Sequence, residues 1–446
     1  MAAADKAGKP LGFWMCTSLI VGNVIGIGIF MLPSSLAPYG LNAFLGWAVV
    51  VLGCICVAHV FSHLARSLPH EDGPYGYARR AFGSGAAFFV MWCYWVSVWV
   101  TNATIAVGVV GYLMAVFPAL GQSALVAPAL AISLIWLFVL TNLRGAQSSC
   151  RVQLICTVLK LLPMVAVFML GGWVLLSNPA AYAAHVPATP LSFGATTAAG
   201  TIALFSMLGV ECATITSGKV ANPETTIPRA TMCATLIAAA IYIGVSAIPM
   251  FLIPQGELAQ SSAPYVDLFN RFLAADSGKW LALFVIVSGL GALNGWTLIA
   301  GEVTSSFANH AVFPAMFKRS NAHGAPVLAL LLAGVLASAM VAMNYHRSLA
   351  QGYAFLIVLV TAASLPLYII CALGLIKLVR RGVIVGPGGK TGVLLLSAGG
   401  VVAFSVWALF GVGRESSLWA LALGAVSLPV FYGMRGARRT LAAPVP

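Results

Sequence analysis

Two apolar segments of this sequence carry glycine and polar residues in the middle of an otherwise hydrophobic run. The first has glycines at positions 22, 26 and 28 around Asn23, and the second runs from Phe205 through Ser206 and Gly209 to Glu211. Glycines at matching places in two apolar segments indicate helices that are unwound there. An unwound stretch leaves carbonyls at the end of one half-helix and amide N–H groups at the start of the next. The alternative is that these glycines only let helices pack closely.

These backbone groups suit a ligand that carries both charges. Amides near Ile27 and Gly28 can hold a carboxylate, whereas carbonyls can hold an ammonium near Val24, Phe205 and Leu208. Glycine at positions 26 and 28 lets a ligand approach the backbone closely. Because an α-amino acid has both groups, the pattern predicts an amino acid site halfway across the apolar layer.

Two ionisable residues lie far from the ends of their apolar segments. Glu211 follows the second interruption, and Lys160 lies within Val158–Pro163. A charge at the bilayer centre is costly, so it normally faces a cavity or a partner. Glu211 is predicted to be a counter-charge for the substrate or a proton acceptor, the alternative being a packing hydrogen bond. Lys160 is predicted to replace a bound sodium ion or to carry a proton, and pairing with a helix-end carbonyl is an equal alternative.

The composition indicates that membrane-spanning helices position the two interruptions and the two ionisable residues. Of 446 residues, 61% are hydrophobic and 7% are charged, against about 25% charged in soluble proteins. This excludes water-soluble enzymes, nucleic-acid binders and disordered scaffolds. Apolar blocks predict an all-α polytopic membrane protein whose twelve spans cover residues 11–36, 41–63, 84–117, 123–142, 150–177, 192–218, 229–253, 278–307, 325–344, 351–376, 391–412 and 416–434.

Basic residues predict the orientation of these spans. If the N-terminus is inside, 18 of the 23 Lys and Arg lie in inner segments and 4 in outer segments, and the remaining one is Lys160. This asymmetry supports the span count and favours both termini in the cytoplasm. The first apolar run continues to Pro33, so it is interpreted as a permanent span and not as a cleaved signal.

The two interruptions lie five spans apart, and five spans reverse the direction of the chain. The sequence therefore predicts one transmembrane domain, 1–446, built as a 5+5 inverted repeat with discontinuous helices one and six. The repeats would be 10–177 and 192–376, with two additional helices over 391–434.

Other motifs argue against cofactors. The nine cysteines lie mostly in apolar segments, and no spacing matches a metal site or a phosphate-binding loop. We therefore expect no metal, no cofactor and no nucleic-acid partner. A membrane-embedded enzyme would need a nucleophile with a base or clustered His and Asp within spans, and the sequence has neither.

These features together resemble the amino acid–polyamine–organocation transporters, and within them the bacterial arginine/agmatine and lysine/cadaverine antiporters. The residues that carry the resemblance are Gly22–Pro33, Gly73–Gly83, Gly209–Glu211 with Asn222-Pro223, and Gly295–Thr297. The resemblance implies a LeuT-like fold, alternating access and a homodimer. Arg79 and Arg80, in the expected loop Gly73–Gly83, would anchor the chain beside an inner gate, or would simply be inner positive charge.

The resemblance also implies a role for particular positions. The stretch 26–28 matches the carboxylate cradle, and Trp296 matches an aromatic lid. Tyr94 and Asn102 match pocket residues of span three, and Ser97 and Ile105 share their helical face. The predicted substrate-binding residues are Asn23, Val24, Gly26, Ile27, Gly28, Tyr94, Ser97, Asn102, Ile105, Phe205, Ser206, Leu208 and Trp296, with Lys160 and Glu211 for coupling or pH sensing.

Three positions depart from the arginine/agmatine pattern. Phe205 stands where that branch usually has tryptophan, and Ile27 and Ala292 stand where it usually has serine. These changes make the pocket less polar, which suits a different or smaller side chain. Lys160 resembles the span-five lysine of sodium-independent exchangers and proton-coupled permeases.

The sequence thus predicts a sodium-independent secondary carrier that exchanges amino acids, or an amino acid and its amine. A proton-coupled symporter that uses Lys160 or Glu211 is the alternative. A channel or a membrane-embedded enzyme is a third class of function.

Overall fold

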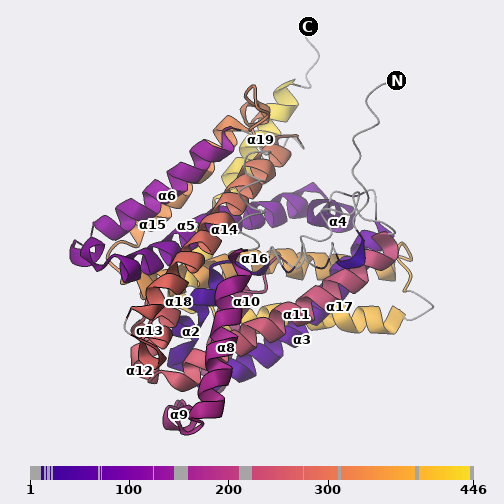
Figure 1. Ribbon diagram of the computed structural model, residues 1–446. Coiled ribbons are helices and arrows are strands. Elements are labelled where there is room, and N and C mark those ends of the chain that lie inside the picture. Colours follow the sequence, from indigo (N-terminus) through magenta and orange to yellow (C-terminus); the bar gives the residue numbers. More distant parts are fainter. Residues whose placement is uncertain are drawn as a thin grey trace.

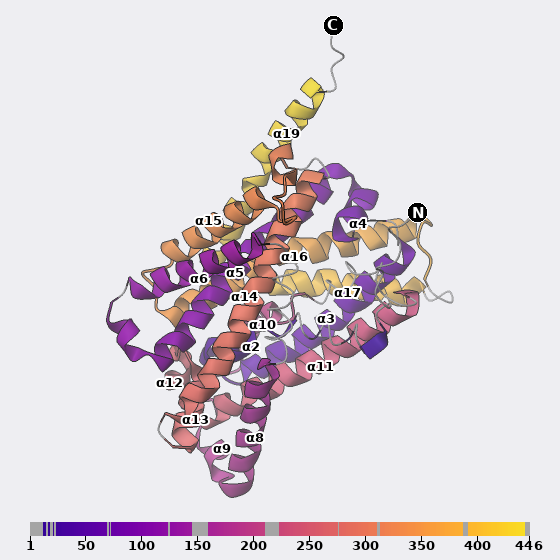
Figure 2. The same ribbon diagram turned by 45° about the horizontal axis from the view of Figure 1, so that its top comes forward.

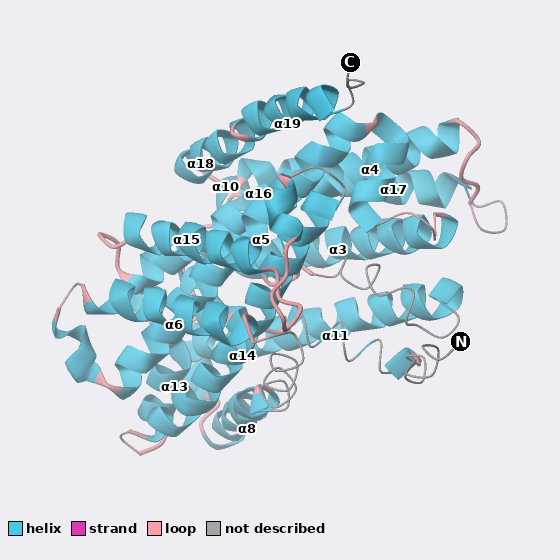
Figure 3. Cartoon of the chain, turned by 90° about the horizontal axis from the view of Figure 1, so that it is seen from above, coloured by secondary structure: helices cyan, strands magenta, loops and turns pink. Residues whose placement is uncertain are grey.

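The computed structural model describes residues 12–14, 17, 21, 24–68, 71, 73–123, 125–144, 159–209, 223–274, 276–309, 313–386 and 391–441. Within these ranges the chain consists of helices and loops and contains no strand (Figure 3). The prediction of an all-helical chain is therefore confirmed.

Seven described segments are long and apolar enough to cross a membrane. Helices suit a bilayer because they satisfy every backbone hydrogen bond internally. The seven segments are α3 (Asn42–Ser67), α5 (Ser84–Val116), α11 (Pro223–Leu252), α14 (Ser277–Asn309), α16 (Leu349–Arg380), α17 (Thr391–Phe410), and α18 (Arg414–Ala425) continuing into α19 (Ser427–Leu441). Shorter apolar helices are α6 (Val126–Asn142), α8 (Leu161–Ser177), α10 (Phe193–Phe205) and α15 (Val327–Met343). The count of twelve spans and the inverted repeat stay predictions.

The helices form two flanks around a shared centre. On one flank α6 lies beside α15, and on the other α3 lies beside α11 and α17 (Figures 1 and 2). Between them α5 packs against both α14 and α16, and α10 packs against α3 and α16. Glycine allows the close approach of α3 and α10, because a Cβ added at Gly46 would lie 2.7 Å from the backbone nitrogen of Gly200.

Span one is interrupted where the sequence predicts it. Residues 25–27 are not helical, and α2 (Gly28–Leu36) begins immediately after them. Val24 lies before the interruption in helical conformation. The expected break in helix one is therefore present within the described residues.

In span six, a helix ends where the sequence predicts a break. Helix α10 ends at Phe205, and the next amides turn tightly: Ser206 N donates to the Ala203 carbonyl over 3.1 Å. Gly209 then has a φ of +104°, a conformation that favours glycine because a Cβ would clash with the backbone. The second half of the predicted span, residues 210–222, lies outside the described residues.

The segment expected as a loop before span three is a helix, α4 (Gly73–Phe82). The expectation was wrong because the Gly-Pro and Gly residues, which usually break helices, lie in its first turn, where proline is tolerated. Its inner face buries Tyr77, Ala78 and Ala81, and Arg79 pairs with Glu71 over 3.2 Å. Other short helices are α9 (Ala180–Ala184), α12 (Gln255–Gln260), α13 (Pro264–Phe272), and the 3-10 turns η1 (Ala37–Tyr39), η2 (Pro118–Gln122) and η5 (Ala315–Lys318).

Candidate functional site

The break in span one exposes backbone carbonyls, and distant side chains satisfy them. The ammonium of Lys160 donates to the Ile25 carbonyl over 3.1 Å, and the Tyr242 hydroxyl donates to the Val24 carbonyl over 3.0 Å. Lys160 is 5% exposed and stands at the N-cap of α8. A buried ammonium needs such partners because water is not available to it. The contact with a helix-end carbonyl, one of the alternatives for Lys160, is therefore present.

The helix that follows the break is held in the same way. The Tyr112 hydroxyl donates to the Phe30 carbonyl over 2.7 Å, and the Tyr265 hydroxyl lies 3.3 Å from the Ile29 carbonyl. Both tyrosines are fully buried. Four carbonyls around the start of α2 thus have side-chain donors that come from α5, α11, α13 and the start of α8.

The two breaks meet. A Cβ added at Gly28 would lie 3.2 Å from Cε1 of Phe205 and 3.6 Å from the Tyr353 hydroxyl. The Oγ of Ser206 is buried without a hydrogen-bond partner among the described residues. The first amides of α2 have no partner within their helix, and no side chain caps them. The junction therefore places the N–H donors at the start of α2 beside a buried hydroxyl.

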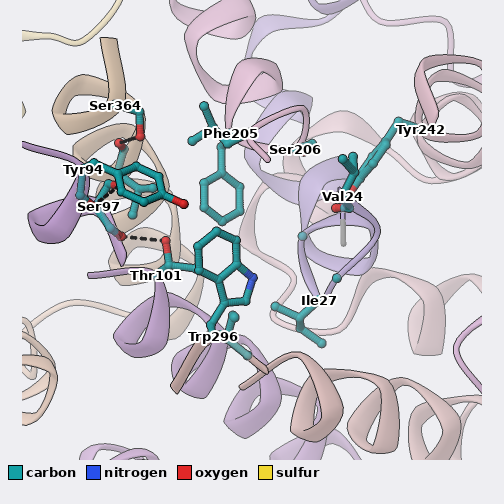
Figure 4. A pocket seen from close by; sticks show the side chains of 15 residues that line it. Val24, Ile27, Tyr94, Ser97, Thr101, Phe205, Ser206, Tyr242, Trp296 and Ser364 are labelled. Carbon is teal, nitrogen blue, oxygen red and sulfur yellow. Dashed lines mark hydrogen bonds between the residues drawn. The ribbon is translucent and has the colours of Figure 1, made fainter. Parts of the chain in front are cut away.

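A cavity of about 40 Å³ lies at this junction (Figure 4). We call it the central cavity. Its lining residues are Val24, Gly26, Ile27, Gly28, Tyr94, Ser97, Thr101, Ile105, Phe205, Ser206, Leu208, Tyr242, Trp296, Val360 and Ser364. The structure thus brings together most of the residues that the sequence singled out, from spans one, three, six and eight.

The wall opposite the breaks consists of continuous helices that carry hydroxyls. On α5, the Ser97 hydroxyl donates to the Tyr94 carbonyl and the Thr101 hydroxyl to the Ser97 carbonyl, each over 2.7 Å. On α16, Ser364 donates to the Val360 carbonyl over 2.9 Å. Each hydroxyl proton is used within its own helix, so the oxygen faces a ligand as an acceptor. This wall suits N–H donors.

Two aromatic side chains separate the two walls. In Figure 4 the rings of Phe205 and Trp296 lie between the hydroxyl wall and the group of Val24, Ile27 and Tyr242. A volume of about 40 Å³ holds only small molecules such as water, whereas ligand pockets usually measure several hundred cubic ångströms. Binding of a larger ligand therefore requires these rings to move.

Four predicted residues are not in the cavity lining, and one of them is Lys160, which contacts the Ile25 carbonyl instead. Asn102 is 2% exposed and its Oδ1 lies 3.5 Å from Thr297 Oγ1, so it packs behind the wall and not in it. Asn23 and Glu211 lie outside the described residues. Their contact with a substrate stays a prediction.

Four lining residues were not predicted from sequence. Thr101 lies four residues after Ser97 on the same helical face, so its spacing could have identified it. Tyr242, Val360 and Ser364 come from spans seven and ten, and their apolar surroundings give no local signal. No group of three or more His, Cys, Asp or Glu side chains suited to a metal ion occurs within the described part of the chain.

Comparison with known proteins agrees with this architecture. The model of the amino acid permease family matches residues 11–430. The chain belongs to the amino acid permease family. It is a multi-pass membrane protein, and the expected membership of the amino acid–polyamine–organocation group is confirmed.

The names of proteins similar to this permease mention amino acids and polyamines. The chain is 30% identical over 407 residues to the putative arginine/ornithine antiporter of Bacillus subtilis, covering 84% of this chain and 85% of that protein. It is 30% identical over 354 residues to the cadaverine/lysine antiporter of Escherichia coli, covering 78% of each. It is 28% identical over 411 residues to the putrescine transporter of Escherichia coli, covering 92% and 93%. This permease is therefore an amino acid or amine transporter in the broad sense.

Proposed function

We propose that this permease is a sodium-independent exchanger of amino acids, or of an amino acid and its amine, that works by alternating access at the central cavity. The observation that carries the proposal is that the uncapped start of α2 at Gly28, the end of α10 and the hydroxyl wall line one cavity. Amides at a helix start attract a carboxylate, and acceptor oxygens attract ammonium or guanidinium groups. The names of the relatives support the same substrate class.

Lys160 supports the proposed sodium independence. Its ammonium already occupies the Ile25 carbonyl at the break, where a monovalent cation would otherwise find a backbone ligand. The same contact favours the second candidate function, proton-coupled symport, because an ammonium that loses its proton and its charge would bind this carbonyl more weakly. Glu211 is the other candidate for proton coupling.

The proposal includes twelve spans in a 5+5 inverted repeat, with both termini in the cytoplasm of a bacterium. Two matching pairs of elements support the repeat. Helix α4 precedes α5 as α13 precedes α14, and α5 and α14 are each 33 residues long. The 18 to 4 asymmetry of basic residues supports the orientation.

Exchange is tested in proteoliposomes free of sodium. Vesicles are loaded with unlabelled arginine, lysine, ornithine, putrescine or cadaverine, and uptake of the labelled compounds is measured. We expect saturable uptake only into loaded vesicles. Accumulation in empty vesicles under an acid-outside gradient would instead identify the symporter, and unsaturable flux would identify a channel.

The site is tested with a pair of tryptophan variants on α14. Trp296→Ala should abolish uptake because its ring lines the central cavity and is expected to close over the substrate. Trp280→Ala is the matched control, since Trp280 lies on the same helix with 74% of its surface exposed. Equal uptake by both variants would contradict the proposed site.

A further inference from the structure

A second, larger cavity lies outside the central cavity. It has a volume of about 560 Å³ and is lined by α5, α16, α18, α19 and the end of α17. We call it the apolar cavity. Its lining side chains are almost all hydrophobic, including Phe89, Trp92, Leu421 and Leu428. Leu421 and Leu428 are 70% and 56% exposed, so the apolar cavity opens at the surface of the chain and can be entered from the membrane.

The apolar cavity has no use in the proposed transport cycle. Its only lining hydroxyls are those of Ser417 and Ser427, and Ser417 donates its proton to the Gly413 carbonyl over 2.7 Å. Apolar cavities of this kind stay dry and take up apolar molecules. A polar amino acid would gain nothing here, whereas a hydrocarbon would be favourably buried.

The dimensions of the apolar cavity match one leaflet of a bilayer. Its lining runs along α18 and α19 from Ser417 to Leu428, which corresponds to roughly 16 Å of helix. One leaflet contributes about 15 Å of hydrocarbon. Arg414 starts α18, three residues before this lining, and is exposed. An arginine at that end suits the phosphate of a lipid headgroup.

We propose that the apolar cavity binds an acyl chain of a phospholipid from the surrounding membrane. The chain lies between α18 and the α5–α16 pair, with its headgroup at the Arg414 end. The helix α18 is placed to hold it, because the Trp92 indole nitrogen donates to the Leu423 carbonyl over 2.8 Å and ties α18 to α5.

The bound chain lies directly behind the hydroxyl wall. On α5, Trp92, Cys93 and Val96 face the apolar cavity, whereas Tyr94 and Ser97 face the central cavity. On α16, Ala362, Ala363 and Pro366 face the apolar cavity, whereas Val360 and Ser364 face the central cavity. A single layer of helix therefore separates lipid from substrate, and the lipid supports that layer from behind.

Photo-crosslinking of the full chain in proteoliposomes tests the proposal. The probe is a phospholipid with a photoactivatable diazirine on its acyl chain, and modified peptides are mapped by mass spectrometry. We expect crosslinks on Trp92–Val96 and Ala362–Pro366. Trp92, Cys93, Ala362 and Ala363 are each at most 6% exposed, so lipid that only surrounds the protein does not reach them.

A cavity-filling variant and its matched control make the test specific. Ala420→Phe fills the apolar cavity, and Ala422→Phe adds the same ring on α18 at an exposed position outside the lining. We expect the crosslinks to be lost in Ala420→Phe and kept in Ala422→Phe. Ala420→Leu should give an intermediate loss and replaces Ala420→Phe if that variant does not fold.

Three outcomes would overturn the proposal. These are the absence of crosslinks on the two buried stretches, their persistence in Ala420→Phe, and a protein–protein crosslink through α18 that shows a second copy of the chain in the cavity. Crosslinking does not depend on transport. Loss of exchange activity would therefore count against the proposed function and leave the lipid site standing.

Discussion

The two walls of the central cavity place polar groups in the membrane in opposite ways. The broken wall, formed by residues 24–28 and the end of α10, exposes backbone groups that residues far away in the sequence must satisfy. The hydroxyl wall on α5 and α16 keeps its backbone continuous, and its polar side chains bond to carbonyls three or four residues away. The broken wall therefore depends on tertiary contacts, whereas the hydroxyl wall depends on the helix alone. Substitutions should be more harmful in the supports of the broken wall.

The largest effect is expected from Lys160→Met. It removes the donor to the Ile25 carbonyl, and a hydrogen bond to a charged group contributes about 2 kcal/mol. We expect a lower melting temperature in detergent, and exchange slower by about tenfold or more. Lys377→Met is the control, because the Lys377 ammonium lies 4.6 Å from the centre of the Phe82 ring near the end of α16 and supports neither wall. If Lys160→Met melts and exchanges like the unmodified protein, the broken wall does not depend on tertiary contacts more than the hydroxyl wall does.

Tyr242→Phe should have the next largest effect. Loss of the hydroxyl leaves the buried Val24 carbonyl without this donor, which costs about 1 kcal/mol or more. Tyr353→Phe is a matched control on a fully buried tyrosine, since its hydroxyl has no hydrogen-bond partner among the described residues. Thermal unfolding should therefore show a clear loss for Tyr242→Phe and none for Tyr353→Phe. The reverse order would mean that the Val24 carbonyl does not need this support.

Gly28→Ala sharpens the comparison within the broken wall. The added methyl would lie 3.2 Å from Phe205 Cε1, so the ring must shift, and overpacking of this kind costs about 1 kcal/mol. Gly26→Ala meets only the Ala292 Cβ, at an ordinary 3.7 Å. We expect the melting temperature to fall more for Gly28→Ala than for Gly26→Ala. Equal melting temperatures would show that Phe205 adapts freely.

The smallest effect on stability is expected in the hydroxyl wall. Ser364→Ala removes a hydroxyl that bonds within its own helix, so the free energy of unfolding should change by less than about 1 kcal/mol. The substrate loses a hydrogen-bond acceptor, so the apparent KM for exchange should rise while the melting temperature stays nearly constant. A large fall in melting temperature with an unchanged KM would make Ser364 a structural residue.

The contrast between the walls also explains what could be read from the sequence. The break in span one was predictable because its glycines and polar residue stand out locally in an apolar run. Tyr94 and Ser97 share a face through helical spacing alone. Tyr242 was missed because its hydroxyl meets Val24 across 218 residues of chain, and no local pattern encodes that contact.

Two further differences have the same origin. Asn102 has the right spacing for the cavity face but packs beside Thr297 on α14, a neighbour that only the tertiary structure reveals. Helix α4 was expected as a loop because its glycines and proline outweighed its buried face in a local interpretation. Lys160 was recognised as unusual from its depth in an apolar segment, although its partner was one of several alternatives.

The four side-chain donors to carbonyls at positions 24, 25, 29 and 30 have a mechanical consequence. They link α2 to α5 and α13, and the break that precedes α2 to α8 and α11. Helix α2 cannot tilt on its own without losing several buried hydrogen bonds together, so it must travel as one rigid body with the elements that hold it. Opening of the site would then be a joint displacement of this bundle, α5 included, against α16, and a local swing of a single gate would not achieve it.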